Sequence, residues 1–305
     1  MIDIAIVGGG PAAYTAAIFA GRAGLNAVVY ESELMAGKIV SISQIENYPG
    51  FPNGISGEKL SDNLHKQAEK LGVDTVYNEV KKVGLDGKYK EILIDSGETI
   101  KAKAVILAIG EMAQKLNCAG EKKFLGKGVS YCAICDGAFF KGRDVAVIGG
   151  GDAALASALY LCHLVKKLYL VHRRNDLRAT KILQDKLKQC EMAELVLNHE
   201  VKEIQGKKFV NGMLLQNKET KTVKRIDVDG VFVYVGSKPN TEIVHEIVKV
   251  DEQGYIITNE KMETSCPGIY AAGDVRKKDL RQLVTAAADG AIASFQARQY
   301  IEMYY

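Results

Sequence analysis

The sequence predicts an α/β fold of two domains, the second inserted into the first, and three observations lead to this prediction. The chain has 305 residues, of which 47% are hydrophobic, enough for two domains with full cores. A segment at its start is repeated near its middle. A further strand and helix that belong with the first copy follow the second copy, so the chain must leave the first domain and return to it.

The repeat consists of a β-branched run, a glycine turn and an alanine-rich stretch. Residues 3–13 (DIAIVGGGPAA) recur at 144–154 (DVAVIGGGDAA), and further apolar runs follow at 27–30 and 168–171. Two parallel strands joined through a helix form a βαβ unit. The sequence therefore predicts two such units, at a spacing too long for a solenoid.

Each copy contains the spacing G-x-G-x-x-A. Its positions are Gly8, Gly10 and Ala13 in the first copy and Gly149, Gly151 and Ala154 in the second. The first glycine permits a tight turn, the second lets the backbone approach a pyrophosphate, and the small third residue lets the helix pack closely. One such motif is often only a structural turn. Two in matching frames predict two Rossmann-like nucleotide-binding domains.

The residue that ends the second strand of each unit distinguishes the two nucleotides. In the first unit this residue is Glu31, whose carboxylate suits the hydroxyl pair of a ribose. In the second unit it is His172, followed by Arg173, Arg174 and Arg178. Guanidinium groups suit a 2′-phosphate, although an exposed basic turn is the alternative interpretation. We therefore expect FAD at the first site and NADPH at the second.

The segment near the C-terminus completes the first site. A strand at 269–272 ends in Gly273 and Asp274, whose carboxylate can bind a ribityl hydroxyl. Arg281 then opens an alanine-rich helix whose N-terminus can stabilise negative charge on a reduced flavin. We expect an FAD domain formed by residues 1–113 and 242–305, with an NADPH domain at 114–241 inserted into it.

A single C-x-x-C motif, Cys132 and Cys135 followed by Asp136, lies in the inserted domain. It could be half of a zinc site, but no second motif completes one, and we expect no metal. It could also be two inert buried thiols. Beside flavin and nicotinamide sites, a redox-active disulfide is the better interpretation, with Asp136 to supply or accept the proton. The other cysteines are expected to be single core or incidental residues: Cys118, Cys162, Cys190 and Cys266.

Charge and hydropathy exclude other classes of protein. The 40 basic and 37 acidic residues leave a net charge of +3 with no long basic run, which argues against a nucleic-acid binder. The uncharged run at 4–21 is short for a membrane span, and its glycines and proline fit a strand–turn–helix. No signal peptide is evident. We expect a soluble cytoplasmic protein.

Together these motifs resemble the low-molecular-weight bacterial thioredoxin reductases, from residue 2 to about residue 301. The matching segments are 8–13, 46–51, 128–137, 172–178, 268–274 and 281–287. The resemblance is specific, because this family places its C-x-x-C-D motif between the nucleotide fingerprint and the closing motif of the flavin site.

The resemblance implies an electron path from NADPH through FAD and the Cys132–Cys135 disulfide to thioredoxin. It implies that Cys135 faces the flavin, that Cys132 attacks the protein disulfide and that Asp136 is the acid. It also implies flavin contacts from Asn47, Gln282 and Lys38, where Lys38 stands in place of a common glutamine. Members of the family are homodimers whose NADPH domain swivels.

Two departures from the family keep alternatives open. Ala156 and Ser157 replace a frequent pair of glutamates, and Glu111 replaces a common alanine near the first domain crossing. One alternative is a reductase of the same fold that serves a glutaredoxin-like or peroxidase partner, or that accepts electrons from NADH or ferredoxin. A non-enzymatic flavin redox sensor is the other alternative.

Overall fold

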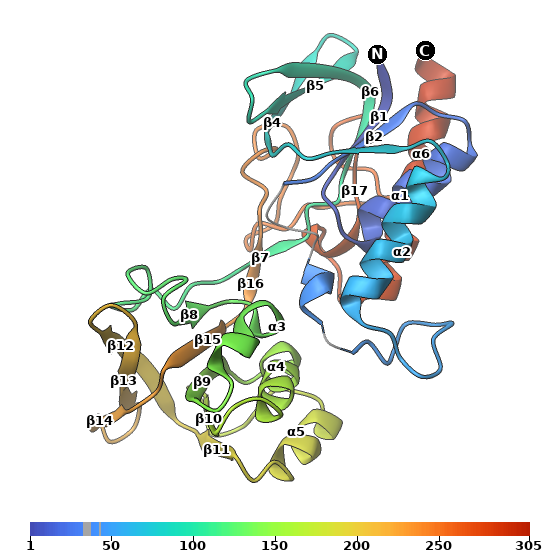
Figure 1. Cartoon of the computed structure of the whole chain (residues 1–305). Coiled ribbons are helices and arrows are strands. Elements are labelled where there is room, and N and C mark those ends of the chain that lie inside the picture. The colour runs from blue at the N-terminus through green and yellow to red at the C-terminus, as the bar shows by residue number, and fades with distance from the viewer. Residues whose placement is uncertain (33–37, 43) are drawn as a thin grey trace. The chain divides into compact units, whose positions relative to one another are not determined.

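A computed structural model describes residues 1–32, 38–42 and 44–305 of the chain (Figure 1). The chain divides into two compact units. The terminal unit comprises Met1–Met112 and Lys238–Tyr305, and the middle unit comprises Ala113–Ser237. The chain therefore leaves the terminal unit once and returns to it.

The terminal unit is built on a seven-stranded sheet in the order β3-β2-β1-β6-β5-β4, with β17 pairing with β6. Its strands are β1 (Ile2–Val7), β2 (Ala27–Tyr30), β3 (Asp74–Val76), β4 (Val80–Asp86), β5 (Tyr89–Ile94), β6 (Thr99–Leu107) and β17 (Ile269–Ala271). Its helices are α1 (Pro11–Arg22), η1 (Lys38–Ser41), α2 (Gly57–Glu69), η3 (Gly273–Val275) and α6 (Leu283–Tyr304).

Alternate side chains of β1 enter two separate cores. Ile4 and Ile6 pack with α1 and α6 on one face of the sheet, whereas Ala5 and Val7 pack with side chains of β4 and β5 on the other. A strand covered on both faces has no polar side, which explains the continuous apolar run in the sequence.

The middle unit repeats this plan around a parallel sheet in the order β11-β10-β9-β15-β8. Its strands are β8 (Val129–Ser130), β9 (Asp144–Gly149), β10 (Lys167–Val171), β11 (Ala193–Val196) and β15 (Gly230–Tyr234), and an antiparallel sheet is formed by β12 (His199–Gly206), β13 (Val210–Asn217) and β14 (Val223–Ile226). Its helices are α3 (Ala133–Asp136), η2 (Gly137–Phe140), α4 (Asp152–Cys162) and α5 (Lys181–Lys188).

The predicted repeat is confirmed at the level of backbone pairing. In the terminal unit β1 pairs in parallel with β2, with Ile4 opposite Ala27. In the middle unit β9 pairs in parallel with β10, with Val145 opposite Leu168. Val145 and Val147 pack against α4 while Ala146 and Ile148 face β12 and β13, so β9 is buried on both faces as β1 is. The predicted α/β fold with two Rossmann-like domains is therefore correct, although β4 and β5 add an antiparallel part to the sheet of the terminal unit.

The chain passes between the units at β7 (Glu111–Ala113) and at β16 (Ser237–Pro239), which form a two-stranded sheet. Within the middle unit the backbone amide of Gln114 donates to the carbonyl of Gly236 at 2.8 Å. The outgoing and returning segments thus run together.

One expectation about the cysteines is wrong. Cys162, at the end of α4, and Cys190, just after α5, form a disulfide with their Cα atoms 6.8 Å apart. Their separation of 28 residues gave no local signal, because only the packing of α5 on α4 brings them together. Cys118 and Cys266 are free thiols, as expected.

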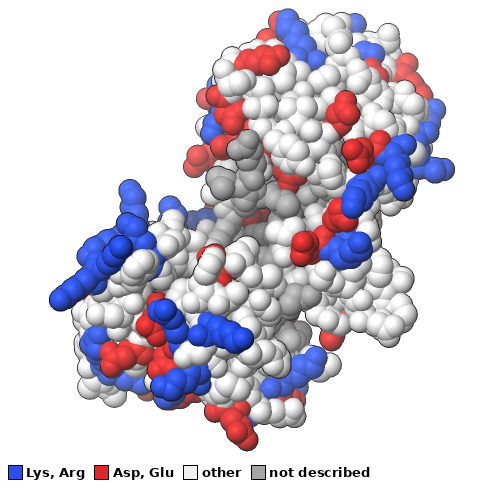
Figure 2. Space-filling model, viewed as in Figure 1, with Lys and Arg blue, Asp and Glu red and all other residues white. Residues whose placement is uncertain are grey.

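Side chains of both charges are spread over the face of the molecule in Figure 2, in keeping with the near balance of 40 basic and 37 acidic residues. Among residues 1–32, 38–42 and 44–305, no helix is both long and apolar enough to cross a membrane.

Candidate functional site

The first glycine turn joins β1 to α1 and leaves open space at one position. Gly8 has a φ of +119°, and a Cβ there would overlap the carbonyl of Ala108, so only glycine fits. At Gly10 the backbone is extended, with a φ of −87°, and a Cβ would meet no atom within 4 Å. Ala13 is fully buried in the core beneath the turn. The turn therefore presents bare backbone to a space outside the protein core.

Glu31, at the end of β2, faces this turn. Its side chain lies where a Cβ on Gly9 would be, and it is only 4% exposed. Its Oε2 accepts a hydrogen bond of 2.9 Å from the Tyr14 hydroxyl, while its buried Oε1 has no partner among the described residues. Burial raises the pKa of Glu31, and the hydrogen bond from Tyr14 offsets this only in part. An unsatisfied buried carboxylate oxygen implies a donor that a ligand would supply.

A cavity of about 220 Å³ opens between this turn and the N-terminus of α6. The lining residues that were predicted to bind a nucleotide, together with Gly9 between them, are Gly8, Gly9, Gly10, Glu31, Gly273, Asp274 and Gln282. Because the N-termini of α1 and α6 both border the cavity, it favours negative charge at both ends. The structure thus brings together the predicted residues of the first site from both segments of the terminal unit.

The segment after β17 is held in place by a buried ion cluster. The amide of Gly273 donates to Asp289 at 3.0 Å, and Asp289 forms ion pairs with Arg276 at 2.8 Å and Lys278 at 2.9 Å. All three charged side chains are largely buried. The turn that carries Asp274 is therefore fixed to α6.

Gln282 caps α6 and receives a second predicted residue of the site. The side-chain amide of Asn47 donates to the Gln282 carbonyl oxygen at 3.0 Å. Gln282 also forms a capping box with Thr285. Lys38, predicted to lie in this site, begins η1, but its side chain lies outside the described residues.

Arg281 belongs to a cluster that the sequence analysis did not find. Its guanidinium stacks on the ring of Tyr255, 4.1 Å from the centroid, and its Nε lies 3.5 Å from the carboxylate of Glu111. The Tyr255 hydroxyl donates to Glu111 at 2.8 Å, and burial together with this bond raises the pKa of Tyr255 to about 12. The glutamate noted as a departure from the family thus anchors a predicted flavin-site arginine.

The second glycine turn, between β9 and α4, has the same construction. Gly149 has a positive φ, and a Cβ there would overlap the carbonyl of Tyr234 and the methyl of buried Ala154. A Cβ on Gly150 would overlap the ring of His172, whereas Gly151 borders open space. His172 thus occupies the place in the second turn that Glu31 occupies in the first.

The environment of His172 favours the neutral ring. It is 5% exposed, and its Nε2 has no partner among the described residues. Burial lowers the pKa of His172, and the positive charges of Arg178, Arg174 and Arg173 lower it further. At neutral pH the imidazole adds no charge to the site, and its unpartnered nitrogen is available to a ligand.

The second turn borders a cavity of about 240 Å³, and two of the three predicted arginines line it. Arg173, Arg174 and Arg178 are exposed, and none of them forms an ion pair within the part of the chain that the structure describes. Arg173 and Arg178 line the cavity together with Gly149, Gly150 and His172. A group of unpaired guanidiniums beside a dinucleotide turn is suited to an additional phosphate.

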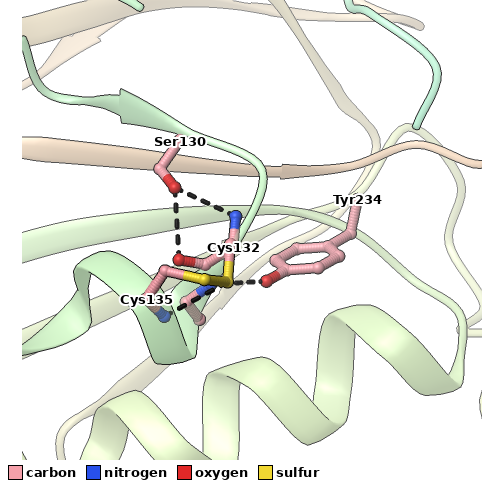
Figure 3. The surroundings of a disulfide bond; sticks show 5 residues. Ser130, Cys132, Cys135 and Tyr234 are labelled. Atoms are coloured by element: carbon pink, nitrogen blue, oxygen red, sulfur yellow. Dashed lines mark hydrogen bonds between the residues drawn. A yellow bond between two sulfur atoms is a disulfide. The ribbon is translucent and has the colours of Figure 1, made fainter. Parts of the chain in front are cut away.

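The C-x-x-C cysteines form a disulfide at the start of α3, with their Cα atoms 5.4 Å apart (Figure 3). The Sγ of Cys132 accepts a hydrogen bond of 3.1 Å from the amide of Cys135. The Ser130 hydroxyl accepts from the amide of Cys132 at 2.9 Å and donates to its carbonyl at 3.2 Å. Cys135 is exposed, whereas Cys132 and Asp136 are half-buried, so the disulfide is open to solvent on one side.

Tyr234, on β15, positions the turn of the disulfide and was missed from the sequence. Its hydroxyl accepts a hydrogen bond of 2.8 Å from the amide of Ala133, the residue after Cys132 (Figure 3). Burial raises the pKa of Tyr234, while hydrogen bonding to Ser157 acts in the opposite direction. Ser157, one of the two departures in α4, is thus connected to the segment that carries the disulfide through its hydrogen bond with Tyr234. A lone tyrosine in a strand gives no signal of this in sequence.

A cavity of about 540 Å³ in the middle unit is bordered by Ser130 and Asp136, which lie on either side of the C-x-x-C motif in the sequence. Its walls include Asp136, Phe139, Phe140, Arg143 and Phe209. Phe139 is 76% exposed and Phe209 58% exposed, which is unusual for aromatic side chains. An exposed aromatic rim around a pocket is typical of a surface that binds another protein. No group of three residues able to hold a metal ion occurs among the described residues.

Residues 2–290 of the chain match the family described as pyridine nucleotide-disulphide oxidoreductase. Over 301 residues the chain is 44% identical to the thioredoxin reductase of Listeria innocua, covering 98% of this chain and 94% of the relative. It is 41% identical over 303 residues to the thioredoxin reductase of Bacillus subtilis, covering 98% of this chain and 95% of the relative.

A solved structure, the thioredoxin reductase of Lactococcus lactis, superimposes on the chain with a TM-score of 0.95 at 38% identity. The match covers 99% of this chain and 100% of that structure. Similarity therefore extends over both units.

Proposed function

The chain belongs to the pyridine nucleotide-disulphide oxidoreductase family, and from this membership we propose that it is a flavoprotein disulfide reductase that passes electrons from NADPH to thioredoxin. The observation that carries the proposal is the combination of one C-x-x-C disulfide with two glycine turns that differ in one facing side chain. Glu31 faces Gly9 in the first turn, and His172 faces Gly150 in the second.

The first cavity suits FAD. The bare backbone at Gly10 has room for a pyrophosphate, and the buried Oε1 of Glu31 lacks the donor that a ribose hydroxyl would supply. Asp274 would hold a ribityl hydroxyl, and Asn47, Gln282 and Arg281 would border the ring system. When bound, FAD supplies two-electron transfer between the nicotinamide and the disulfide. We accordingly assign the terminal unit to FAD and the middle unit to the nicotinamide nucleotide.

The second cavity suits NADPH better than NADH. Gly151 has the same open space as Gly10, but the residue facing the turn is a neutral imidazole rather than a carboxylate. Arg173 and Arg178 line the same cavity, and NADH, which lacks the 2′-phosphate, would leave their charges without an anionic partner. This arrangement favours NADPH as donor over the alternatives of NADH and ferredoxin.

The two cysteines would act by thiol–disulfide exchange. Once Cys132 and Cys135 are reduced, one thiolate attacks the partner's disulfide and forms a mixed disulfide, releasing one partner thiol. The second thiolate then attacks the sulfur of the first cysteine in this mixed disulfide, which releases the fully reduced partner and restores the Cys132–Cys135 bond. Asp136, half-buried at the end of α3, would take up and return the proton in these steps.

The order of the two cysteines follows from the family resemblance, in which Cys132 attacks the partner and Cys135 faces the flavin. The exposure of the side chains favours the reverse order, because Cys135 is exposed and Cys132 half-buried. The serine variants described in the Discussion distinguish the two orders.

The cavity rimmed by Phe139 and Phe209 supports a protein as the substrate. A small disulfide would need no aromatic rim, whereas the exposed side chain of Phe139 suits an apolar contact with a folded partner. We propose that thioredoxin docks here, next to Asp136, the residue that follows Cys135.

A homodimer is the proposed assembly. Helices α1 and α6 pack on each other and carry the exposed apolar side chains Phe19, Ile292 and Phe295. Such side chains on neighbouring helices favour burial against a second copy. Sedimentation velocity at micromolar concentration is expected to give one species of twice the chain mass.

Anaerobic titration tests the proposed function. The purified protein is expected to be yellow, to be bleached by stoichiometric NADPH but only weakly by NADH, and to regain its colour when oxidised thioredoxin is added. Bleaching by reduced ferredoxin and not by NADPH would replace the proposed donor. Bleaching by NADPH without recovery on addition of thioredoxin would instead support a redox sensor.

A further inference from the structure

The disulfide between Cys162 and Cys190 has no part in the proposed electron path. Cys162 is the last residue of α4, and Cys190 follows the C-terminal end of α5. The two helices pack together through Leu155, Leu161 and Leu187. The disulfide therefore joins the C-terminal ends of two helices that share one core.

The opposite ends of these helices meet at the second glycine turn. The amides of Arg178 and Ala179, just before α5, donate to the carbonyl of Gly150 at 2.7 and 3.0 Å. The amide of Thr180 donates to Asp152, the first residue of α4, at 2.7 Å. Hydrogen bonds thus join the helices at the nucleotide end, and a covalent bond joins them at the other end.

Helix α5 links the hydrogen bonds at the glycine turn to the disulfide at its other end. From within α5, the side-chain amide of Gln184 donates to the carbonyl of Ala179 at 2.7 Å. A displacement of α5 relative to α4 would therefore move Ala179 and its neighbour Arg178, and with them the contacts to Gly150. Formation of the disulfide restricts this displacement because it fixes the far end of α5 to α4.

We propose that Cys162 and Cys190 are a second redox-active pair, separate from Cys132 and Cys135, whose oxidation holds α5 against α4 and so preorganises the loop of Arg178 for the phosphates of a pyridine nucleotide. The inference rests on the proposed function for the identity of the nucleotide, but the redox chemistry of the pair is independent of it.

The oxidant that fits this site is a low-molecular-weight disulfide, R–S–S–R. Cys162 is 4% exposed whereas Cys190 is half-buried, so the Cys190 thiolate is the first to react. It attacks R–S–S–R, forms the mixed disulfide Cys190–S–S–R and releases one R–SH. Cys162 then attacks the Cys190 sulfur and releases the second R–SH. Two thiols are oxidised, one external disulfide is reduced, and both protons leave on the two R–SH molecules.

Alkylation of the holoprotein tests the pair itself. The protein is reduced with dithiothreitol under anaerobic conditions, desalted, equilibrated with oxidised glutathione, unfolded in urea and alkylated with iodoacetamide. Peptide mapping is expected to show Cys162 and Cys190 losing their label together, while Cys118 in the same unit keeps it. Full labelling of both cysteines after Cys132 and Cys135 have become oxidised would overturn the proposal.

Nucleotide binding tests the coupling, with adenosine 2′,5′-bisphosphate as the probe. Calorimetry is expected to give a Kd roughly three- to tenfold lower for the oxidised than for the reduced protein, because less ordering of the loop remains to be done on binding. The Cys190→Ser variant is expected to show the weaker Kd in both states. It retains the Cys132–Cys135 pair, so any effect of that pair appears in the variant as well.

The control variant Cys118→Ser, which removes a free thiol of the same unit, is expected to keep the difference between the oxidised and reduced proteins. Equal Kd values in both states of the unmodified protein would overturn the coupling. Absence of binding in both states would overturn both the proposed nucleotide and the coupling, and the alkylation result would still decide whether the pair is redox-active.

Discussion

Single residues at equivalent positions give the two glycine turns their different chemistry. Gly9 and Gly150 each lie against the side chain that ends the neighbouring strand, and that side chain is Glu31 in one unit and His172 in the other. Both side chains are buried and each has an atom without a partner within the described part of the chain. Each of these side chains can therefore form a hydrogen bond with a polar group of the ligand bound at its turn.

Replacement of Gly10 by valine is expected to abolish FAD binding without unfolding the protein. The backbone at Gly10 is extended, at φ −87° and ψ −176°, which valine adopts readily, and a Cβ meets no atom within 4 Å. The side chain would fill the space that a pyrophosphate needs. The ratio of flavin to protein absorbance measures the loss. The matched control is Gly151→Val at the equivalent position of the second turn, which is expected to keep its FAD, and stoichiometric FAD in Gly10→Val would disprove the assignment.

Replacement of Arg173 by alanine is expected to weaken NADPH binding and to leave NADH binding nearly unchanged. A charge-assisted hydrogen bond to a phosphate contributes about 1.5–3 kcal/mol, so the Kd for NADPH rises roughly ten- to hundredfold. Fluorescence titration with both nucleotides measures the difference. Lys166→Ala, which removes an exposed charge elsewhere in the unit, serves as the control. An equal loss for both nucleotides would mean that the arginine is structural.

Glu31 is expected to make the FAD-free protein less stable as the pH rises. Burial holds the pKa of Glu31 above its usual value of 4.5. Below pH 4.5 the carboxyl is protonated in both the folded and the unfolded chain. As the pH rises through the raised pKa, the folded chain must ionise a buried group, and the free energy of unfolding decreases.

Glu31→Gln is therefore expected to stabilise the FAD-free protein at pH 7 but not at pH 4, and to weaken FAD binding at pH 7. Urea unfolding of the apoprotein at both values of pH measures the first effect, and flavin retention measures the second. The exposed Glu69→Gln substitution in α2 is the control. Equal stability of Glu31→Gln and the unmodified protein at pH 7 would show that the buried carboxylate does not lower the free energy of unfolding.

At the scale of secondary-structure elements, α3 depends on its neighbours for its position. It has only four residues, too few to be stable alone, and the first amide of the helix is held by the hydroxyl of Tyr234 on β15. The disulfide at its start is therefore oriented by the parallel sheet of the middle unit rather than by the helix itself.

Tyr234→Phe is expected to slow thioredoxin reduction and to destabilise the middle unit. The buried amide of Ala133 would lose its partner, at a cost of about 1–3 kcal/mol, while the aromatic packing is kept. We expect roughly a tenfold lower kcat/KM for thioredoxin. Steady-state turnover and urea unfolding measure the two effects. Tyr160→Phe in α4, a tyrosine whose hydroxyl makes no hydrogen bond among the described residues, is the control, and equal effects of both substitutions would remove Tyr234 from the positioning role.

At the scale of the whole molecule, the disulfide and the proposed flavin cavity lie in different units of the chain. Electron transfer therefore requires both units. Replacement of either cysteine is expected to change the spectrum of the flavin as well as the reduction of the partner.

The serine variants of the two cysteines test this requirement. Both variants are expected to accept a hydride from NADPH, and neither is expected to turn over thioredoxin, because exchange needs two sulfurs. Cys132→Ser leaves the Cys135 thiolate beside the flavin and is expected to show a long-wavelength charge-transfer band. Cys135→Ser leaves the attacking Cys132 and is expected to trap thioredoxin as a mixed disulfide. Trapping by Cys132→Ser instead would exchange the two roles, and full turnover by either variant would remove the pair from the mechanism.

Much of this organisation could be predicted from the sequence because it depends on neighbours along the chain. The glycine turns, the strands around them and the residues Glu31 and His172 follow from spacing, since a βαβ unit places the end of its second strand beside the turn after its first. The C-x-x-C disulfide was likewise local, because its cysteines are only three positions apart in the sequence.

Only the tertiary structure decided the contacts between residues that are remote in sequence. The pairing of Cys162 with Cys190 depends on how α5 packs on α4, and the cluster of Glu111, Tyr255 and Arg281 joins three distant segments of the terminal unit. The bond from Ala133 to Tyr234 spans 101 residues. Such contacts have no fixed spacing along the chain, because side-chain packing selects them after the sheets have formed, and so no local pattern of residues indicates them.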